Sequence, residues 1–146
     1  MKYNYTPEDF YLAADMPVRF RDLDPLNHVN NAVYNSYFEE ARVKFIHAIP
    51  EFSKSMAEGH SFVLVNINLN YIKPVVYGEK IIVCSSVKEF GNSSISGIQA
   101  IFSKEESELK AVAETTGVWF NLKNQRPARL PDISNREQYL FDKNYG

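Results

Sequence analysis

Residues 61–71 read Ser-Phe-Val-Leu-Val-Asn-Ile-Asn-Leu-Asn-Tyr, and this stretch decides what kind of fold the chain can form. Apolar side chains occupy the odd positions from Val63 to Tyr71, whereas asparagines stand between them at 66, 68 and 70. A period of two is typical of a β-strand with one apolar and one polar face. We therefore expect a strand over 61–71 that buries one of its faces.

A long helix is expected just upstream of this strand. From about residue 30 to residue 48, apolar side chains recur every four positions, at Val33, Tyr37, Ala41 and Phe45. This spacing places them in one broad stripe along a helix of about 19 residues, roughly 28 Å long. Such a stripe must be buried against another layer of the protein.

The remaining periodic segments predict strands. Including 61–71, we expect strands over 16–21, 61–71, 79–90, 93–102 and 108–121. Short connections, such as the hairpin signal Gly91-Asn92, favour an antiparallel meander. The last strand carries one face of mostly small side chains, which lets a helix lie close against it: Leu109, Ala111, Ala113, Thr115, Gly117 and Trp119.

This order of elements predicts an α+β fold, a five-stranded antiparallel sheet wrapped around one long central helix, in a single domain over 1–146. One helix cannot cover the two edges of such a sheet. Because uncovered edges tend to pair with other chains, we expect the protein to self-associate.

The composition excludes several classes of protein. Sixteen Lys and Arg against eighteen Asp and Glu give a formal net charge of −2, so no overall positive field attracts nucleic acid. The single cysteine, Cys84, cannot form an internal disulfide or a Cys-x-x-Cys site, which favours a reducing compartment. Neither a secretory signal nor a membrane-spanning apolar run of about 18 residues is visible. We therefore expect a cytoplasmic protein that does not associate with membranes.

The loop before the helix carries the candidate catalytic side chains. Residues 21–31 read Arg-Asp-Leu-Asp-Pro-Leu-Asn-His-Val-Asn-Asn, so Asp22, Asp24 and His28 stand just ahead of the helix N-terminus. Backbone N–H groups at a helix start lack intrahelical partners, and the helix dipole adds partial positive charge there. Such N–H groups can hold a developing oxyanion while a carboxylate attacks or activates water, which is the chemistry of acyl transfer.

Other interpretations of these residues stay open. Asp, Asn and Pro before a helix are commonly capping and turn residues. Asp22-x-Asp24 after an apolar strand is also typical of aspartyl-phosphate phosphatases, but the alternating strands and helices of that fold are missing after residue 60. Asp22, Asp24 and His28 could instead ligate a metal, although the sequence offers no second ligand cluster. There is no Gly-x-Ser-x-Gly nucleophile motif.

Two adjoining motifs resemble a known family. Asp24-Pro-Leu-Asn-His-Val-Asn-Asn31 followed by Tyr34-x-x-Tyr37-Phe-Glu-Glu-Ala-Arg42 resembles the signature of hotdog-fold acyl-CoA thioesterases of the 4-hydroxybenzoyl-CoA thioesterase-like group. The His-Val-Asn-Asn run also resembles acyl-ACP thioesterases of plants and bacteria. Further similarity, in the run Tyr-Ile-Lys-Pro-Val-Val-Tyr-Gly-Glu at 71–79 and in the last strand, extends the resemblance over roughly 16–133.

The resemblance implies a role for each matching position. Asp24 corresponds to the catalytic carboxylate, acting as nucleophile or general base, and His28 to a residue that helps hold the substrate carbonyl or water. The backbone N–H groups near Val29 and Asn30 would form the oxyanion hole. Asn27 stands where relatives often have glycine, and asparagine tolerates a left-handed backbone better than most residues.

The resemblance also implies a substrate and an assembly. The substrate would be an acyl-CoA, hydrolysed to free acid and CoA without a cofactor or metal. Alternatives are an acyl thioester of acyl carrier protein, or a hotdog domain that binds acyl thioesters without turnover. Family members form homodimers or homotetramers with active sites at the subunit interface. Glu39 and Arg42 match motif positions on the helix, and we expect structural roles for both.

Overall fold

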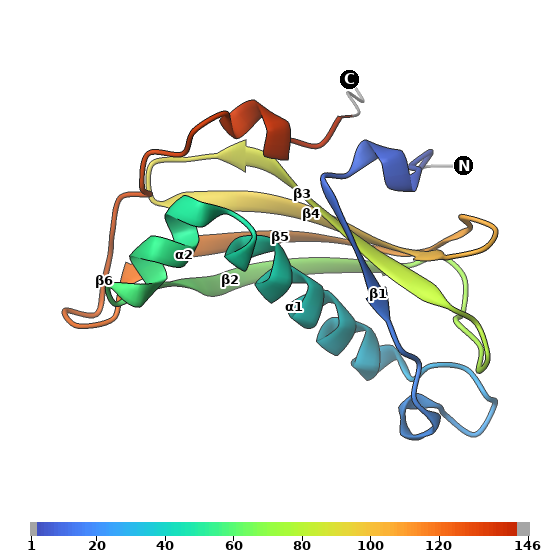
Figure 1. Cartoon of the computed structure of the whole chain (residues 1–146). Helices are drawn as coiled ribbons and strands as arrows, with labels where there is room; N and C mark the ends of the chain where they lie inside the picture. Colours follow the sequence, from blue (N-terminus) through green and yellow to red (C-terminus); the bar gives the residue numbers. More distant parts are fainter. Residues whose placement is uncertain (1–2, 143–146) are drawn as a thin grey trace.

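The computed structural model describes residues 3–142 as a curled antiparallel sheet with a long helix across one face (Figure 1). The strands are β1 (Leu12–Met16), β2 (His60–Tyr71), β3 (Ile81–Phe90), β4 (Ser94–Ser103), β5 (Leu109–Asn121) and the short β6 (Arg126–Pro127). The helices are α1 (Asn31–His47) and α2 (Pro50–Ala57), and 3-10 turns occupy Pro7–Asp9, Phe20–Asp22 and Arg136–Tyr139. The predicted α+β architecture with one long central helix is confirmed.

The order of strands across the sheet differs from the predicted meander. It is β1-β3-β4-β5-β2, so β3, β4 and β5 follow one another but β2 pairs with β5 at the far edge. β2 and β5 are the two longest strands, and their pairing runs from His60–Asn121 to Tyr71–Ala111. This arrangement satisfies more backbone groups than pairing β2 with the shorter β3 would.

The first strand lies earlier than the predicted 16–21. β1 ends at Met16 because Pro17 has no N–H group to continue the ladder with β3. After the proline, the Asp22 carboxylate accepts the Arg19 backbone N–H at 3.0 Å and closes the 3-10 turn Phe20–Asp22. A local side-chain hydrogen bond has therefore replaced extended structure.

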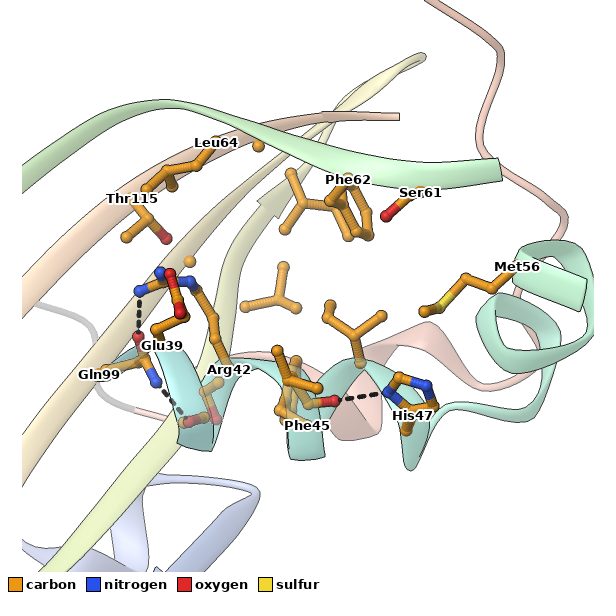
Figure 2. Close-up of a pocket in the computed structure, with 18 residues that line it drawn as sticks. Glu39, Arg42, Phe45, His47, Met56, Ser61, Phe62, Leu64, Gln99 and Thr115 are labelled. Atoms are coloured by element: carbon orange, nitrogen blue, oxygen red, sulfur yellow. Dashed lines mark hydrogen bonds between the residues drawn. The ribbon is translucent and has the colours of Figure 1, made fainter. Parts of the chain in front are cut away.

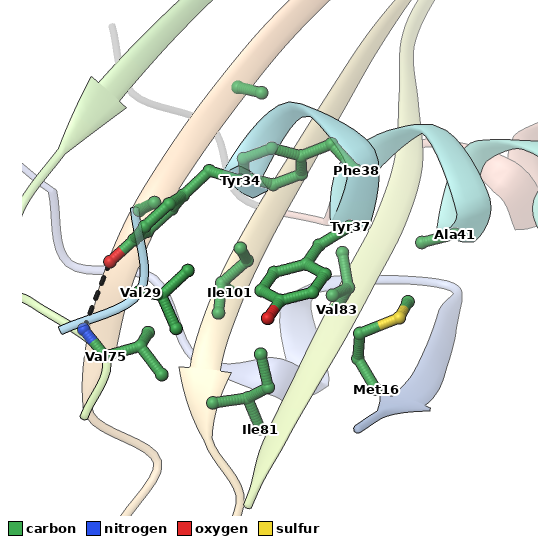
Figure 3. Close-up of a cluster of buried hydrophobic side chains, with 12 residues drawn as sticks. Met16, Val29, Tyr34, Tyr37, Phe38, Ala41, Val75, Ile81, Val83 and Ile101 are labelled. Atoms are coloured by element: carbon green, nitrogen blue, oxygen red, sulfur yellow. Dashed lines mark hydrogen bonds between the residues drawn. The ribbon is translucent and has the colours of Figure 1, made fainter. Parts of the chain in front are cut away.

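The apolar stripe of α1 packs on the inner face of the sheet (Figure 3). Tyr34 and Phe38, both nearly fully buried, lie in the same core cluster as the small Ala111 and Ala113 of β5, as the small-residue face predicts. One member of that face departs from the prediction. The pairing with β4 shifts at Lys110, so Leu109 belongs to the core cluster on the outer face of the sheet.

The edge strand β2 is less buried than its sequence pattern predicts. Val63, Val65 and Tyr71 are 41%, 58% and 48% exposed, because β2 lies at the edge and is not fully covered by α1. The structure therefore leaves a row of apolar side chains beside an unpaired strand edge. Within residues 3–142, no helix combines the length and apolar content needed to cross a bilayer.

Candidate active site

Asp24 holds the loop before α1 in a tight turn. Its Oδ1 accepts the backbone N–H groups of Leu26 at 2.8 Å and His28 at 3.1 Å, and its own N–H donates to the His28 carbonyl at 2.7 Å. Asn27 adopts a left-handed backbone with φ 62°, as its capacity for that conformation predicts. Oδ1 thus has the turn-forming role that the sequence left open for Asp24. The Oδ2 atom of this half-buried carboxylate accepts no hydrogen bond from residues 3–142.

The loop at 74–79 holds this turn in place through backbone contacts. The Val29 N–H donates to the Val75 carbonyl at 2.8 Å, the Tyr77 N–H donates to the Asn27 carbonyl at 3.3 Å, and His28 forms a β-bridge with Val76. These contacts fix the backbone of half-buried His28. Its ring makes no hydrogen bond with the described part of the chain.

The loop at 74–79 is itself anchored by a buried lysine. The Lys110 Nζ donates to the Pro74 carbonyl at 3.2 Å and forms ion pairs with Glu79 and Glu108, each at 3.0 Å. Burial opposes the charged form, but hydrogen bonds to the two carboxylates outweigh it and raise the pKa of Lys110. Glu79 also accepts the Val76 N–H at 2.9 Å, so the ammonium group and the loop form one network.

The predicted oxyanion donors are corrected by the structure. The Val29 N–H is used by Val75, and the Asn30 N–H donates to the Asp22 carbonyl at 2.8 Å. Asn30 is instead the N-cap of α1, and its side chain accepts the Ala32 N–H at 2.9 Å. At the helix start, the Asn31 N–H has no acceptor among residues 3–142. Locating the N-cap at Asn30 would have identified it from the sequence.

Asp22 serves the scaffold. Its side chain is 3% exposed, accepts the Tyr37 hydroxyl at 2.7 Å and forms an ion pair with Arg19 at 3.2 Å. Burial favours the neutral acid, but the hydrogen bonds from Tyr37 and Arg19 outweigh it and lower the pKa of the Asp22 carboxyl. Across residues 3–142, no group of three or more His, Cys, Asp or Glu side chains could hold a metal ion, and Asp22 already has other partners.

A cavity of about 380 Å³ lies between the second half of α1 and the inner face of the sheet (Figure 2). Its walls are mainly apolar, with Phe45, Ile46, Met56, Phe62, Val87 and Ile95 among them. Its floor is formed by small residues of the strands: Ser85, Gly97, Thr115 and Gly117. The volume is within the range of small-molecule sites. The small-residue face of β5 therefore both admits α1 and opens a hollow.

The Asp24 turn precedes the N-terminus of α1, whereas the cavity lies along the second half of that helix. The helix rises 1.5 Å per residue, so Phe45 in the cavity wall is about 21 Å along the axis from Asn31. Between them lies the packed cluster around Tyr34 and Phe38. Sequence reasoning did not identify the cavity, because its walls come from α1, α2 and four strands that only the fold brings together.

A polar group lies at the end of the cavity nearer the helix start. Arg42 extends from α1 and donates to the Gln99 Oε1 atom of β4 at 3.2 Å, while Glu39 lies one turn earlier on the helix (Figure 2). Figure 2 shows Met56 and Phe62 at the opposite end. Glu39 and Arg42, for which the sequence predicted structural roles, both line the cavity.

Comparison with known proteins identifies the class to which this fold and site belong. The family model of the thioesterase-like superfamily matches residues 18–136, so the chain belongs to that superfamily. Solved structures of hotdog thioesterases share its curled sheet and central helix, which confirms the predicted hotdog fold. The chain is accordingly a thioester hydrolase.

Three relatives illustrate the similarity. The chain is 33% identical to the long-chain acyl-CoA thioesterase FadM of Escherichia coli, over 82% of this chain and 90% of FadM. It is 27% identical to the chloroplastic acyl-acyl carrier protein thioesterase ATL3 of Arabidopsis thaliana, of which it spans 62%. A Thermus thermophilus thioesterase, solved in complex with coenzyme A and Zn, is 36% identical with a TM-score of 0.72, over 85% of this chain and 94% of that one.

Proposed function

We propose that the chain hydrolyses an acyl-CoA to free acid and CoA, with Asp24 as the catalytic carboxylate. The observation that carries this proposal is the arrangement of the loop before α1. Asp24 is held by its Oδ1 while Oδ2 stays free, beside a helix start whose Asn31 N–H is unpaired within residues 3–142. The name of the relative FadM supports acyl-CoA as the substrate class.

Two features of this loop support the proposed hydrolysis. The Asn31 N–H and the partial positive charge of the helix start stabilise the oxygen of the thioester carbonyl as it gains charge. Asp24 then acts in one of two ways. As a nucleophile it attacks the carbonyl carbon, the C–S bond breaks, and water hydrolyses the resulting anhydride. As a general base it takes a proton from the attacking water and passes it to the departing thiolate. His28 orients the carbonyl or the water.

Substitutions at two positions test this assignment. Asp24→Asn is expected to lower kcat by at least about 100-fold, the scale of a lost general base or nucleophile. Compared with Asn31→Ala, Asn31→Pro removes the N–H and leaves the backbone in place, because proline is favoured at the first helical position and Asn30 already has the extended backbone that precedes proline. We expect about a 100- to 1000-fold loss of kcat, whereas the matched control Asn31→Ala keeps the N–H and the activity. Thiol release by both Asp24→Asn and Asn31→Pro at the wild-type rate would refute the site.

The carrier of the acyl group is a further proposal. We favour CoA over acyl carrier protein because the relative matched over most of its length, FadM, is an acyl-CoA thioesterase, whereas ATL3 is matched over 62%. Comparing kcat/KM for one acyl group on CoA and on acyl carrier protein distinguishes them. Tight binding of acyl-CoA by folded protein, with no thiol release on either carrier, would instead favour the non-catalytic alternative.

We further propose that the active unit is a homodimer, or a tetramer built from such dimers. Two observations support it: the apolar edge of β2 is uncovered, and the cavity lies along the second half of α1, from about 12 Å (Glu39) to about 24 Å (His47) beyond Asn31. An antiparallel pair of chains would bring the Asp24 turn of one copy to the cavity of the other. We also place the protein in the cytoplasm, because the free Cys84 suits a reducing compartment.

The dimer proposal predicts complementation between two inactive variants. Asp24→Asn lacks the carboxylate, and Ile95→Trp is designed to fill the cavity. If each site combines the Asp24 turn of one copy with the cavity of the other, a mixed dimer contains one intact site and recovers activity. Activity that stays absent after unfolding and refolding the two variants together would contradict a shared site. Val65→Lys, on the exposed edge of β2, is expected to shift the mass measured by light scattering to that of one chain.

A further inference from the structure

The polar end of the cavity is built around one buried amide. Gln99 is 2% exposed, and its Nε2 donates to the Phe38 carbonyl of α1 and to the Ser85 Oγ, both at 3.0 Å. With both donors used, the Oε1 atom is left to accept from Arg42 at 3.2 Å. Gln99 is therefore fixed in one orientation, and it fixes the guanidinium in turn.

Arg42 lies on the cavity wall, and several of its N–H donors have no acceptor among residues 3–142. A guanidinium carries five N–H donors, and among residues 3–142 Gln99 is its hydrogen-bond partner. Burial lowers the pKa of Arg42, although the nearby Glu39 carboxylate opposes that shift. No carboxylate of the described chain pairs with the guanidinium within the 4.0 Å of an ion pair. A partly buried charge whose hydrogen-bond partner is a neutral amide, with a carboxylate nearby but not paired with it, is costly to keep. Its free donors are well placed for an acceptor inside the cavity.

The other side chains of the cavity indicate which kind of ligand carries that acceptor. Away from Arg42 the walls are apolar, with Phe45, Met56 and Phe62 suited to a hydrocarbon chain. Glu39 places negative charge beside the guanidinium, so a second carboxylate in the cavity would be repelled by it. The ligand that satisfies both conditions is apolar and carries a neutral oxygen.

We propose that Arg42 is a specificity residue that hydrogen-bonds an oxo or hydroxyl oxygen on the acyl chain. The enzyme then favours oxygenated acyl groups over unsubstituted ones of equal length. Gln99 is the positioning residue, since it acts by fixing the guanidinium. This inference rests on the proposed acyl-CoA thioesterase function and adds to it the chemical class of the acyl group.

The test compares matched substrates that differ by one oxygen. We would measure kcat/KM for octanoyl-CoA and for octanoyl-CoA bearing an oxo group at carbon 3, 5 or 7. The wild type is expected to favour at least one oxo substrate by 10-fold or more. Arg42→Met is expected to bring that ratio to within twofold of one, and Arg42→Lys, which keeps the charge but not the planar fork, to an intermediate value. Lys44→Met, an exposed position on the same helix, is expected to keep the wild-type ratio.

Two results would overturn the inference: a wild-type ratio below twofold for every oxo substrate, or a ratio unchanged in Arg42→Met. If Arg42→Met does not fold, Gln99→Met takes its place, and it should reduce the ratio in the same direction. If the wild type releases no thiol from any substrate, the proposed hydrolysis fails, and the inference is judged by binding. Calorimetry with octanoic acid and with 3-, 5- and 7-oxooctanoic acid then decides: at least 10-fold tighter binding of one oxo acid supports the inference, and equal binding of all of them refutes it.

Discussion

Replacing Tyr37 by phenylalanine removes one hydrogen bond from the buried carboxylate of Asp22 and leaves the packing of the ring in place. The bond joins the Tyr37 hydroxyl to Oδ2 at 2.7 Å, a length typical of a hydroxyl donating to a charged acceptor. Hydrogen bonds to charged groups contribute about 1.5–3 kcal/mol. Because Arg19 still donates to the carboxylate from its backbone and side chain, we expect a loss of about 2 kcal/mol.

The same substitution changes the response to acid. The hydrogen bonds from Tyr37 and Arg19 hold the pKa of Asp22 below its ordinary value, against the effect of burial. The stability that this carboxylate contributes is present above its unfolded pKa and is lost as the pH falls through its folded pKa. Without the Tyr37 donor, the folded pKa of Asp22 rises, so the variant should begin to lose stability at a higher pH than the wild type.

Urea unfolding between pH 3 and pH 7, followed by circular dichroism, measures both effects. Tyr11→Phe is the matched control, since Tyr11 is 41% exposed and loss of its hydroxyl should cost less than about 0.5 kcal/mol. The difference between Tyr37→Phe and the wild type should be largest near pH 7 and should shrink below about pH 4. A loss under about 0.5 kcal/mol at pH 7, or a difference that does not change with pH, would refute the reasoning.

Three further outcomes follow from the structure. Lys110→Met should lower kcat more than 10-fold and the free energy of unfolding by about 1–3 kcal/mol, because the loop at 74–79 loses its anchor. Lys88→Met, which removes an exposed ion pair, should change the free energy of unfolding by less than about 1 kcal/mol. Equal kcat for these two variants would contradict the anchoring role. Burial raises the pKa of the Cys84 thiol to about 12, so Ellman's reagent should label it only at the rate of unfolding; rapid labelling of native protein would exclude its burial. Asn27→Gly should keep stability while Asn27→Val loses about 1–2 kcal/mol, because φ is 62°, and equal melting temperatures would argue against that backbone.

Local features of the fold were predictable from the sequence, and the pairing of distant segments was not. The stripe through Tyr37 and Phe45 predicted α1 within one residue at each end. In contrast, the alternation of β2 indicated a strand but not its neighbour, since period two is the same whichever strand pairs with it. α2 was missed because a helix of eight residues that begins at Pro50 gives little periodic signal.

The candidate site shows the same division. The loop from Asp22 to Asn31 was recognised because it is contiguous, and Asp24 stands at the turn where it was expected. Which N–H groups remain unpaired depends on Val75, which lies more than forty residues later. The hydrogen bond between Arg42 and Gln99 likewise joins a helix to a strand, and nothing in the sequence pattern of either segment indicates that the two side chains meet. Contacts of this kind are tertiary, and one sequence does not specify them.

The position of β2 also sets the order in which the chain can fold as it is synthesised. β2 is complete at Tyr71, yet its partner β5 is complete only at Asn121, about 50 residues and roughly 3–10 s of translation later. During that interval the strand has no native partner, and its valines are exposed to other nascent chains. The asparagines at 66, 68 and 70 interrupt the apolar run and so reduce its tendency to aggregate. The polar face of β2 thus protects the chain before the fold exists.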